Sequence, residues 1–309
     1  MRQASAQGWK MSGVISLVIP TLNAESEIVA LLEKLCSQTR HIDEIVVVDS
    51  SSDDGTAEKA AAFAAKHDQV SVHSIARKDF RHGGTRDLAL REWTTGDFVL
   101  FMTQDAVPAN DRYVASILAP FEDEAVAVSS GRQLPKADAR RFERLVRGFN
   151  YPEESFVRGK DDLPTYGIKT FFISDVCSAY RRSAYLECGG FAKELMMSED
   201  MYMAAKLVVD GYHVAYAADA QVYHSHNLTP KQQYSRNFAI GKFLEENKDI
   251  LMGTSEIGDG KKLATHVAGE LLRSGHIGEL CAFGTDCTAR ILGNRAGRKA
   301  ARKDMAEGR

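Results

Sequence analysis

Short apolar runs alternate with amphipathic stretches through the first hundred residues. The run 14–20 is rich in β-branched residues and ends in a polar turn, after which apolar side chains recur at Ile28, Leu31, Leu32 and Leu35. A continuous apolar run followed by a period near 3.6 residues predicts a strand, a loop and an amphipathic helix.

The same unit is repeated further along the chain. Residues 45–48 predict a second strand, and an alanine-rich helix follows to about His67. Residues 70–75 and 98–102 predict two more strands, with a helix over about 84–93 between them. Apolar strands that alternate with helices predict an α/β fold with a mostly parallel central sheet and helices on both faces.

The alternation weakens after about residue 130. Residues 134–170 mix charged, aromatic and proline residues without a clean period. Helical spacing returns at Ser198, whose hydroxyl is suited to an N-cap, and a helical tail is predicted from about residue 261. We therefore expect one compact domain over 14–245 and a helical C-terminal extension over 246–309.

Composition narrows the classes of protein. A net charge of −3 provides no basic field, so nucleic acid is not expected as a partner. The five cysteines form no CxxC pair, which favours a reducing cytoplasm over a disulfide framework or a zinc knuckle. The first dozen residues lack the apolar core of a signal peptide, and no apolar stretch reaches 18 residues, so any membrane contact is expected to be peripheral.

The end of the chain is locally basic. Residues 290–309 contain seven Lys or Arg against Asp304 and Glu307. Such a helix can rest on an anionic membrane surface, and an ordinary solvated helix explains the pattern equally well.

Three polar segments follow predicted strands. They are residues 20–23, residues 49–55 and residues 103–108. Because ligands bind outside the carboxyl ends of strands in an open parallel sheet, the three segments are expected to share one pocket. There Asp49 could accept a hydrogen bond from a base or a ribose, and Asp105 could hold a divalent cation against a diphosphate.

Glycine-based phosphate sites are excluded. The first polar turn reads Pro-Thr-Leu-Asn rather than GxGxxG, and the chain contains no Walker GxxxxGK sequence. Phosphate charge must therefore be met by a metal and by side chains such as Arg86.

Five segments in order make the chain resemble glycosyltransferase family 2, which has the GT-A fold. They are the strand end at 20–23, the loop 49–56, the helix start at 84–87, the strand end at 103–105 and the acidic segment 198–200. The resemblance covers about 14–245. It implies a nucleotide-sugar-binding half over 14–130 and an acceptor and catalytic half over 131–245.

Other segments resemble bacterial rhamnosyltransferases within that family. They are 80–86, 103–106 and 223–226. The resemblance implies dTDP-L-rhamnose as donor and a glycan or lipid-linked glycan as acceptor. Two departures are Thr-Gln-Asp at 103–105, where the family usually has DxD, and Asp87, where asparagine is common.

Because only one carboxylate remains at the family's metal site, a further protein ligand is expected. Mg²⁺ and Mn²⁺ take about six oxygen-rich ligands. The resemblance places a metal-binding histidine at His224 or His226 beside Asp105. Histidines two apart on a strand point to the same face, so one could bind the cation while the other orients a phosphate or acceptor.

The resemblance also assigns roles in catalysis and binding. It places the catalytic base at Asp200, with Glu199 binding an acceptor hydroxyl or orienting the sugar. A simpler alternative is that both acids only complement the dipole at the start of a helix. Arg236 corresponds to the basic residue of the family's QxxR element, which approaches the diphosphate. The expected nucleotide-sugar-binding residues are Pro20, Thr21, Asn23, Asp49, Ser51, Arg86, Gln104, Asp105 and Arg236.

These observations predict an inverting transferase that moves a sugar to an acceptor hydroxyl in bacterial surface polysaccharide synthesis. A UDP-hexose donor is an alternative, because the sequence does not define the pocket around the sugar. A catalytically silent glycan-binding protein is a second alternative, motivated by the incomplete DxD. A homodimer through the C-terminal helices is a further expectation.

Overall fold

A computed structural model describes residues 13–195, 197–254 and 257–307 of the chain. The first dozen residues, on which the signal-peptide expectation rests, lie outside this range. So does Arg309, one of the seven basic residues counted in the segment 290–309. The first half contains β1 (Ile15–Thr21), α1 (Ile28–Cys36), β2 (Glu44–Asp49), α2 (Thr56–Ala64), β3 (Val70–Ser74), α3 (His82–Glu92), β4 (Phe98–Met102), β5 (Val107–Pro108) and α4 (Tyr113–Leu118). The second half contains β6 (Val126–Leu134), α5 (Arg141–Asn150), β7 (Phe156–Arg158), α6 (Leu163–Tyr166), β8 (Cys177–Arg181), α7 (Arg182–Glu187), α8 (Glu199–Val209), β9 (His213–Tyr223), α9 (Pro230–Glu246), α10 (Ile257–Arg273) and α11 (Ile277–Ala306).

The strands form one mixed sheet in the order β3-β2-β1-β4-β8-β6-β9-β5, with β7 paired to β9. Strands β3, β2, β1 and β4 are mutually parallel, as expected. The second half departs from the mostly parallel expectation, because β8 runs antiparallel to both β4 and β6. Since β9 is parallel to β6, the carboxyl ends of β1, β2, β4, β6 and β9 still lie on the same edge.

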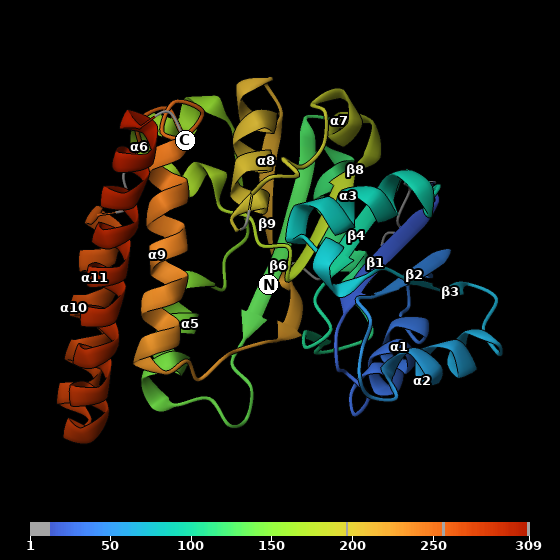
Figure 1. Cartoon of the computed structure of the whole chain (residues 1–309), viewed down its shortest axis with the longest axis horizontal. Coiled ribbons are helices and arrows are strands. Elements are labelled where there is room, and N and C mark those ends of the chain that lie inside the picture. Colours follow the sequence, from blue (N-terminus) through green and yellow to red (C-terminus); the bar gives the residue numbers. More distant parts are fainter. Residues whose placement is uncertain (1–12, 196, 255–256, 308–309) are drawn as a thin grey trace, which may run out of the picture.

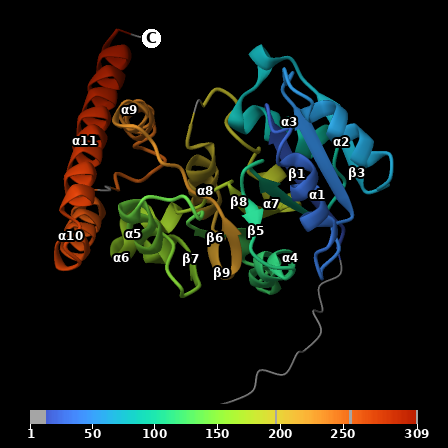
Figure 2. The same cartoon turned by 90° about the horizontal axis from the view of Figure 1, so that it is seen from below.

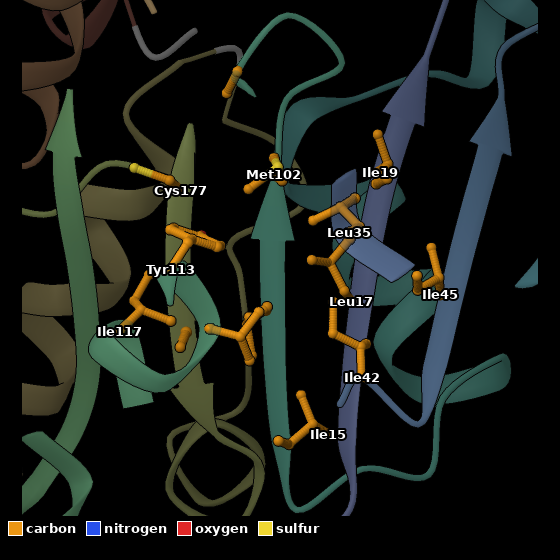
Figure 3. Close-up of a cluster of buried hydrophobic side chains, with 14 of the residues drawn as sticks. Ile15, Leu17, Ile19, Leu35, Ile42, Ile45, Met102, Tyr113, Ile117 and Cys177 are labelled. Carbon is orange, nitrogen blue, oxygen red and sulfur yellow. The ribbon is translucent and has the colours of Figure 1, made fainter. Parts of the chain in front are cut away.

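Hydrophobic clusters cover both faces of this sheet. One cluster joins the strands to α1, α2 and α4, and it contains the fully buried Leu17 and Tyr113. Figure 3 shows its side chains, including Leu35 and Ile45, filling the space beside β1 and β4. The other cluster joins the sheet to α3, α7, α8 and α9. Burial on both faces explains why the strands read as continuous apolar runs.

The helical C-terminal extension packs on α9 and α5. Helices α9 and α11 lie side by side in both views (Figures 1 and 2). Their backbones approach closely at glycines: a Cβ on Gly297 would lie 2.0 Å from the Phe238 carbonyl oxygen, and one on Gly241 would lie 2.2 Å from that of Asn294. The extension is therefore part of the domain's packing, and a small hydrophobic cluster joins Phe142 of α5 to Val267 of α10 and Phe283 of α11.

Two local expectations differ from the structure. Helix α8 begins at Glu199 as predicted, but Ser198 has a left-handed φ of 65° and its side chain makes no capping hydrogen bond. His224 and His226 follow β9 rather than lying within a strand. Among the described residues, no helix combines the length and apolar character that crossing a membrane requires.

Candidate functional site

Asp105, His224 and His226 meet at one edge of the sheet. Asp105 lies between β4 and β5, and the antiparallel pairing of Val107 with Tyr223 brings the two histidines beside it. The Asp105 Oδ2 atom lies 3.4 Å from His224 Nε2 and 3.3 Å from His226 Nε2. The three ligand atoms lie within 4.8 Å of one another, a spacing suited to one metal ion. The structure thus brings together all three residues that the sequence suggested for the metal.

Gln133 determines the tautomer of His224. Its Oε1 atom is 2.5 Å from Arg147 Nη1 and 2.9 Å from His224 Nδ1, while its Nε2 donates to the Ser174 hydroxyl. Because a guanidinium only donates, the shared Gln133 atom is an acceptor, and His224 Nδ1 must carry its proton. In a neutral imidazole, Nε2 then presents a lone pair toward the Asp105 carboxylate. Two facing acceptors at 3.4 Å need a cation or a proton between them.

The charge states of the trio fit a cation. Burial alone would raise the pKa of Asp105, but the neighbouring His224, together with Thr103 and His226, lowers it well below its usual range, so the carboxylate is ionised. Burial and the neighbouring His224 lower the pKa of His226, which favours a neutral ring with a free lone pair. Lys136, which no motif singles out, places its Nζ 3.9 Å from Asp105 Oδ2.

A cavity of about 330 Å³ lies along the carboxyl ends of β1, β2 and β4. It contains four residues expected to bind the nucleotide sugar: Pro20, Thr21, Arg86 and Gln104. The remaining lining residues are Leu22, Ser50, Arg77, Phe80, His82 and Thr103. We call this space the strand-end cavity. Burial, with the charge of Arg86, lowers the pKa of His82 to about 4, so this imidazole is neutral at physiological pH.

Three other expected binding residues hold the loops around this cavity and do not line it. Asp49 is 2% exposed and accepts from the backbone and the hydroxyl of Ser52. Asn23 accepts from the Asp53 backbone, and the Ser51 hydroxyl donates to the Ile75 carbonyl. Their observed contacts fix the loops after β1 and β2, because short polar side chains that bond to nearby backbone stabilise turns.

Gln104 and Arg86 connect segments that are distant in sequence. Gln104 exchanges two hydrogen bonds with the backbone of Leu22, which ties the end of β4 to the end of β1. Arg86 Nη1 lies 2.8 Å from Glu199 Oε1, and both side chains are buried. A Cβ on Gly83 would lie 3.1 Å from the Glu199 Cβ, so a small residue there lets α3 approach α8. Arg86 therefore pairs with the Glu199 carboxylate and also lines the strand-end cavity.

Beside this pair lies a third carboxylate, Asp175, which had no signal in the sequence. Asp175 is 3% exposed, and its Oδ1 accepts from the hydroxyls of Ser178 and Tyr180. Its backbone N–H donates to Asp200 Oδ2 at 3.4 Å. Burial, followed by the charges of Glu199 and Asp175, raises the pKa of Asp200 to about 8. A carboxyl with a pKa near the working pH is suited to general base chemistry.

Arg236 lies apart from the strand-end cavity. It lines a second cavity of about 260 Å³ formed by α5, α9, α11 and the segment after β9, together with His226. Helix α5 lies within the stretch 134–170, for which the sequence showed no clean period, and its side chains line this second cavity.

Comparisons with known proteins agree with this geometry. The sequence model of Glycosyl transferase family 2 matches residues 16–189. Over 229 residues the chain is 42% identical to the O-antigen chain rhamnosyltransferase RfbN of Salmonella typhimurium (strain LT2), covering 74% of this chain and 72% of the relative. It is 40% identical over 232 residues to the O-antigen chain rhamnosyltransferase WbaN of Salmonella anatum, covering 74% and 71%.

A solved structure supports the same fold. The mannosyltransferase PcManGT from Pyrobaculum calidifontis, in complex with GDP-Man and Mn²⁺, superposes with a TM-score of 0.62 at 18% identity, covering 97% of this chain and 90% of that one. The family match over more than half of the chain and the two relatives above 30% identity carry the assignment. The chain belongs to glycosyl transferase family 2 and is a glycosyltransferase with the GT-A fold.

Proposed function

We propose that this enzyme transfers L-rhamnose from dTDP-L-rhamnose to an acceptor hydroxyl during synthesis of a bacterial surface polysaccharide, with inversion at the anomeric carbon. The two relatives that are 42% and 40% identical to this chain are both O-antigen chain rhamnosyltransferases, which supports this donor and this class of product. The observation that carries the chemistry is the convergence of Asp105 and the two histidines on one point, with the Asp200 carboxyl on the adjoining helix α8.

Asp105, His224 and His226 would hold a Mg²⁺ or Mn²⁺ ion, because their ligand atoms converge and Gln133 leaves the His224 Nε2 lone pair free. Such a cation supplies positive charge that stabilises the departing nucleoside diphosphate. The nucleotide part of the donor would occupy the strand-end cavity, where Thr21 and Gln104 lie at the ends of β1 and β4.

Asp200 would act as the base. In its ionised form its carboxylate takes the proton of the acceptor hydroxyl as that oxygen bonds to the anomeric carbon, while the bond from that carbon to the diphosphate breaks. Displacement from the side opposite the leaving group inverts the configuration. Glu199 is held by Arg86, so in this proposal it keeps the start of α8 in place beside the sugar.

The test of the donor is direct. Purified full-length protein is incubated with dTDP-rhamnose or with UDP-sugars, with Mn²⁺, Mg²⁺ or EDTA, and its melting temperature and nucleotide release are measured. We expect metal-dependent stabilisation and release with the dTDP compound, because a ligand that binds only the native state raises apparent stability. A preference for UDP-sugars would replace the donor, and no response to any nucleotide would contradict the proposal.

The base assignment has its own test. Asp200→Asn keeps the side-chain shape but cannot accept the proton, so transfer should fall by about 10²–10⁴-fold. Donor binding in the melting assay should remain. Transfer at the wild-type rate would show that Asp200 is not the base.

We also propose that the enzyme works at the cytoplasmic face of the membrane through the outer side of α11. Ile291 and Leu292 are 52% and 53% exposed there, and the exposed Arg295 and Lys299 follow on the same helix. Apolar and basic side chains together favour an anionic lipid surface. The double variant Ile291→Glu, Leu292→Glu should lose co-sedimentation with phosphatidylglycerol vesicles. If the variant instead converts a dimer to a monomer in gel filtration, this face is a homodimer interface.

A further inference from the structure

Lys136 places a positive charge beside the metal trio. Its Nζ atom lies 3.9 Å from Asp105 Oδ2, and its side chain is 33% exposed. This distance allows an ion pair but exceeds the reach of a hydrogen bond. The ammonium therefore offsets the Asp105 charge while its N–H donors stay available for a ligand that enters from solvent.

The backbone determines where Lys136 lies. The carbonyl of Leu134, the last residue of β6, accepts from the His224 N–H. The Lys136 N–H donates to the hydroxyl of Ser225, the residue between the two histidines of the trio. Lys136 is thus held against the segment that supplies these histidines, while its side chain remains partly open to solvent.

The charges around this point favour an anionic ligand. The trio contains one carboxylate, from Asp105, and two imidazoles whose lone pairs are available to a metal. With a divalent cation bound, the trio carries one surplus positive charge, and Lys136 adds another. The diphosphate of a nucleotide sugar carries about two negative charges at neutral pH and gains more negative charge as the sugar departs.

The position of Lys136 favours the donor over the acceptor. Lys136 faces Asp105, which directly follows Gln104, and Gln104 lines the strand-end cavity proposed for the nucleotide. Lys136 does not line the second cavity. A diphosphate that extends from the strand-end cavity to the trio therefore comes within reach of the flexible Lys136 side chain.

We propose that Lys136 is a further catalytic residue, whose ammonium binds the diphosphate of the donor and stabilises it as it departs. Without donor, the ammonium neutralises Asp105; when the donor binds, it turns to a diphosphate oxygen. As the bond from the anomeric carbon to the diphosphate breaks, its electron pair stays on the diphosphate oxygen. The ammonium offsets that charge and keeps its proton. This inference rests on the proposed function.

This role predicts opposite effects on the metal and on the nucleotide. Lys136→Met removes the charge and keeps the length of the apolar stem. Mn²⁺ alone, followed by the electron paramagnetic resonance of the free ion, should bind about 3–10-fold more tightly, because a like charge near Asp105 is gone. The nucleotide dTDP, titrated calorimetrically at saturating Mn²⁺, should bind about 10-fold or more weakly.

Two further variants control for charge and for folding. Lys136→Arg retains the charge and should restore most of the dTDP affinity. Lys242→Met is the matched control, because Lys242 is similarly exposed (38%), pairs with Asp304 at 2.7 Å and lines neither cavity. Neither affinity should change in Lys242→Met. Thermal unfolding is recorded for every variant.

Several outcomes would overturn the proposal. Unchanged dTDP affinity in Lys136→Met would show that Lys136 only neutralises Asp105. Weaker binding of both Mn²⁺ and dTDP would indicate a structural role in the trio. If the wild type binds UDP in place of dTDP, the donor of the proposed function is replaced, and the same comparison with UDP tests Lys136, because both nucleotides carry the diphosphate. A wild type that binds Mn²⁺ but neither nucleotide would contradict the proposed function and this inference together.

Discussion

Arg86 and Glu199 form a buried ion pair that joins α3 to α8, with Nη1 and Oε1 2.8 Å apart and the two residues 113 positions apart in sequence. Burial raises the pKa of Glu199, while the Arg86 charge opposes that shift. The pair fixes the start of α8, where Asp200 follows directly. The position of the proposed base therefore depends on a contact between the two halves of the domain.

Removing one partner of this pair should be costly. Glu199→Ala leaves the Arg86 charge buried without its partner, and we expect the free energy of unfolding to fall by about 3–5 kcal/mol. Urea denaturation measures the change. Glu25→Ala is the control, because the Lys59–Glu25 pair has side chains about half exposed (48% and 44%) and its loss should cost less than about 1 kcal/mol. Similar losses for both variants would contradict the structural role of Arg86–Glu199.

The raised pKa of Asp200 predicts a pH-dependent stability. A folded-state value of about 8 means that the native protein binds this proton more tightly than the unfolded chain, whose ordinary value is about 3.9. The stabilising contribution is therefore complete below about pH 4 and is lost as the pH rises to about 8. Asp200→Asn should gain melting temperature relative to the wild type across this range. A constant difference between pH 5 and 8.5 would contradict the raised pKa.

Asp175 should control the pH dependence of transfer. Its negative charge, with burial and Glu199, raises the pKa of Asp200, so Asp175→Asn should lower that pKa. The acidic limb of the profile of kcat/KM against pH should then move to lower pH. The hydrogen bonds from Ser178 and Tyr180 to the retained oxygen should preserve the fold. A reduced rate with an unmoved limb would indicate only a structural role.

Gln133 should govern metal affinity without contacting the metal. Gln133→Leu removes the acceptor that fixes His224, and we expect binding of Mn²⁺ to weaken by about 10–100-fold. Gln133→Glu keeps an acceptor oxygen and should bind more tightly than Gln133→Leu. Gln69→Leu is the control, because the Gln69 side chain donates to the Ile42 carbonyl, ahead of β2 and away from the site. Titration followed by electron paramagnetic resonance measures the free ion, and equal affinities would refute this role.

The contact between α9 and α11 predicts opposite effects for one substitution at two glycines. Gly297→Ala places a Cβ against the Phe238 carbonyl, so unfolding should become easier by about 1–3 kcal/mol. Gly284→Ala lies on the same helix with open space around it, and it should stabilise by up to about 1 kcal/mol through helix propensity. Thermal or urea unfolding measures both. Stabilisation by both substitutions would show that the two helices are not closely packed.

The local patterns predicted much of the fold and part of the site. Strands β1, β2 and β4 were predicted because each buries both faces and reads as a short apolar run, and the partly buried edge strand β3 was predicted beside them. Asp105, His224 and His226 could be selected because their types and order match a known family, and the structure brings them together. Asp175, Gln133 and Lys136 could not be selected, since an isolated polar residue has no periodicity or motif that distinguishes it.

The sequence by itself determined the alternation of strands and helices, the family and the residues that follow the strand ends, because these depend on neighbours along the chain. Only the tertiary structure decided the antiparallel insertion of β8, the tautomer of His224 and the separation of Arg236 from the strand-end cavity. These features arise from pairings between distant segments. Their energies depend on burial and on partner charges, which exist only when the sheet and its helices are assembled.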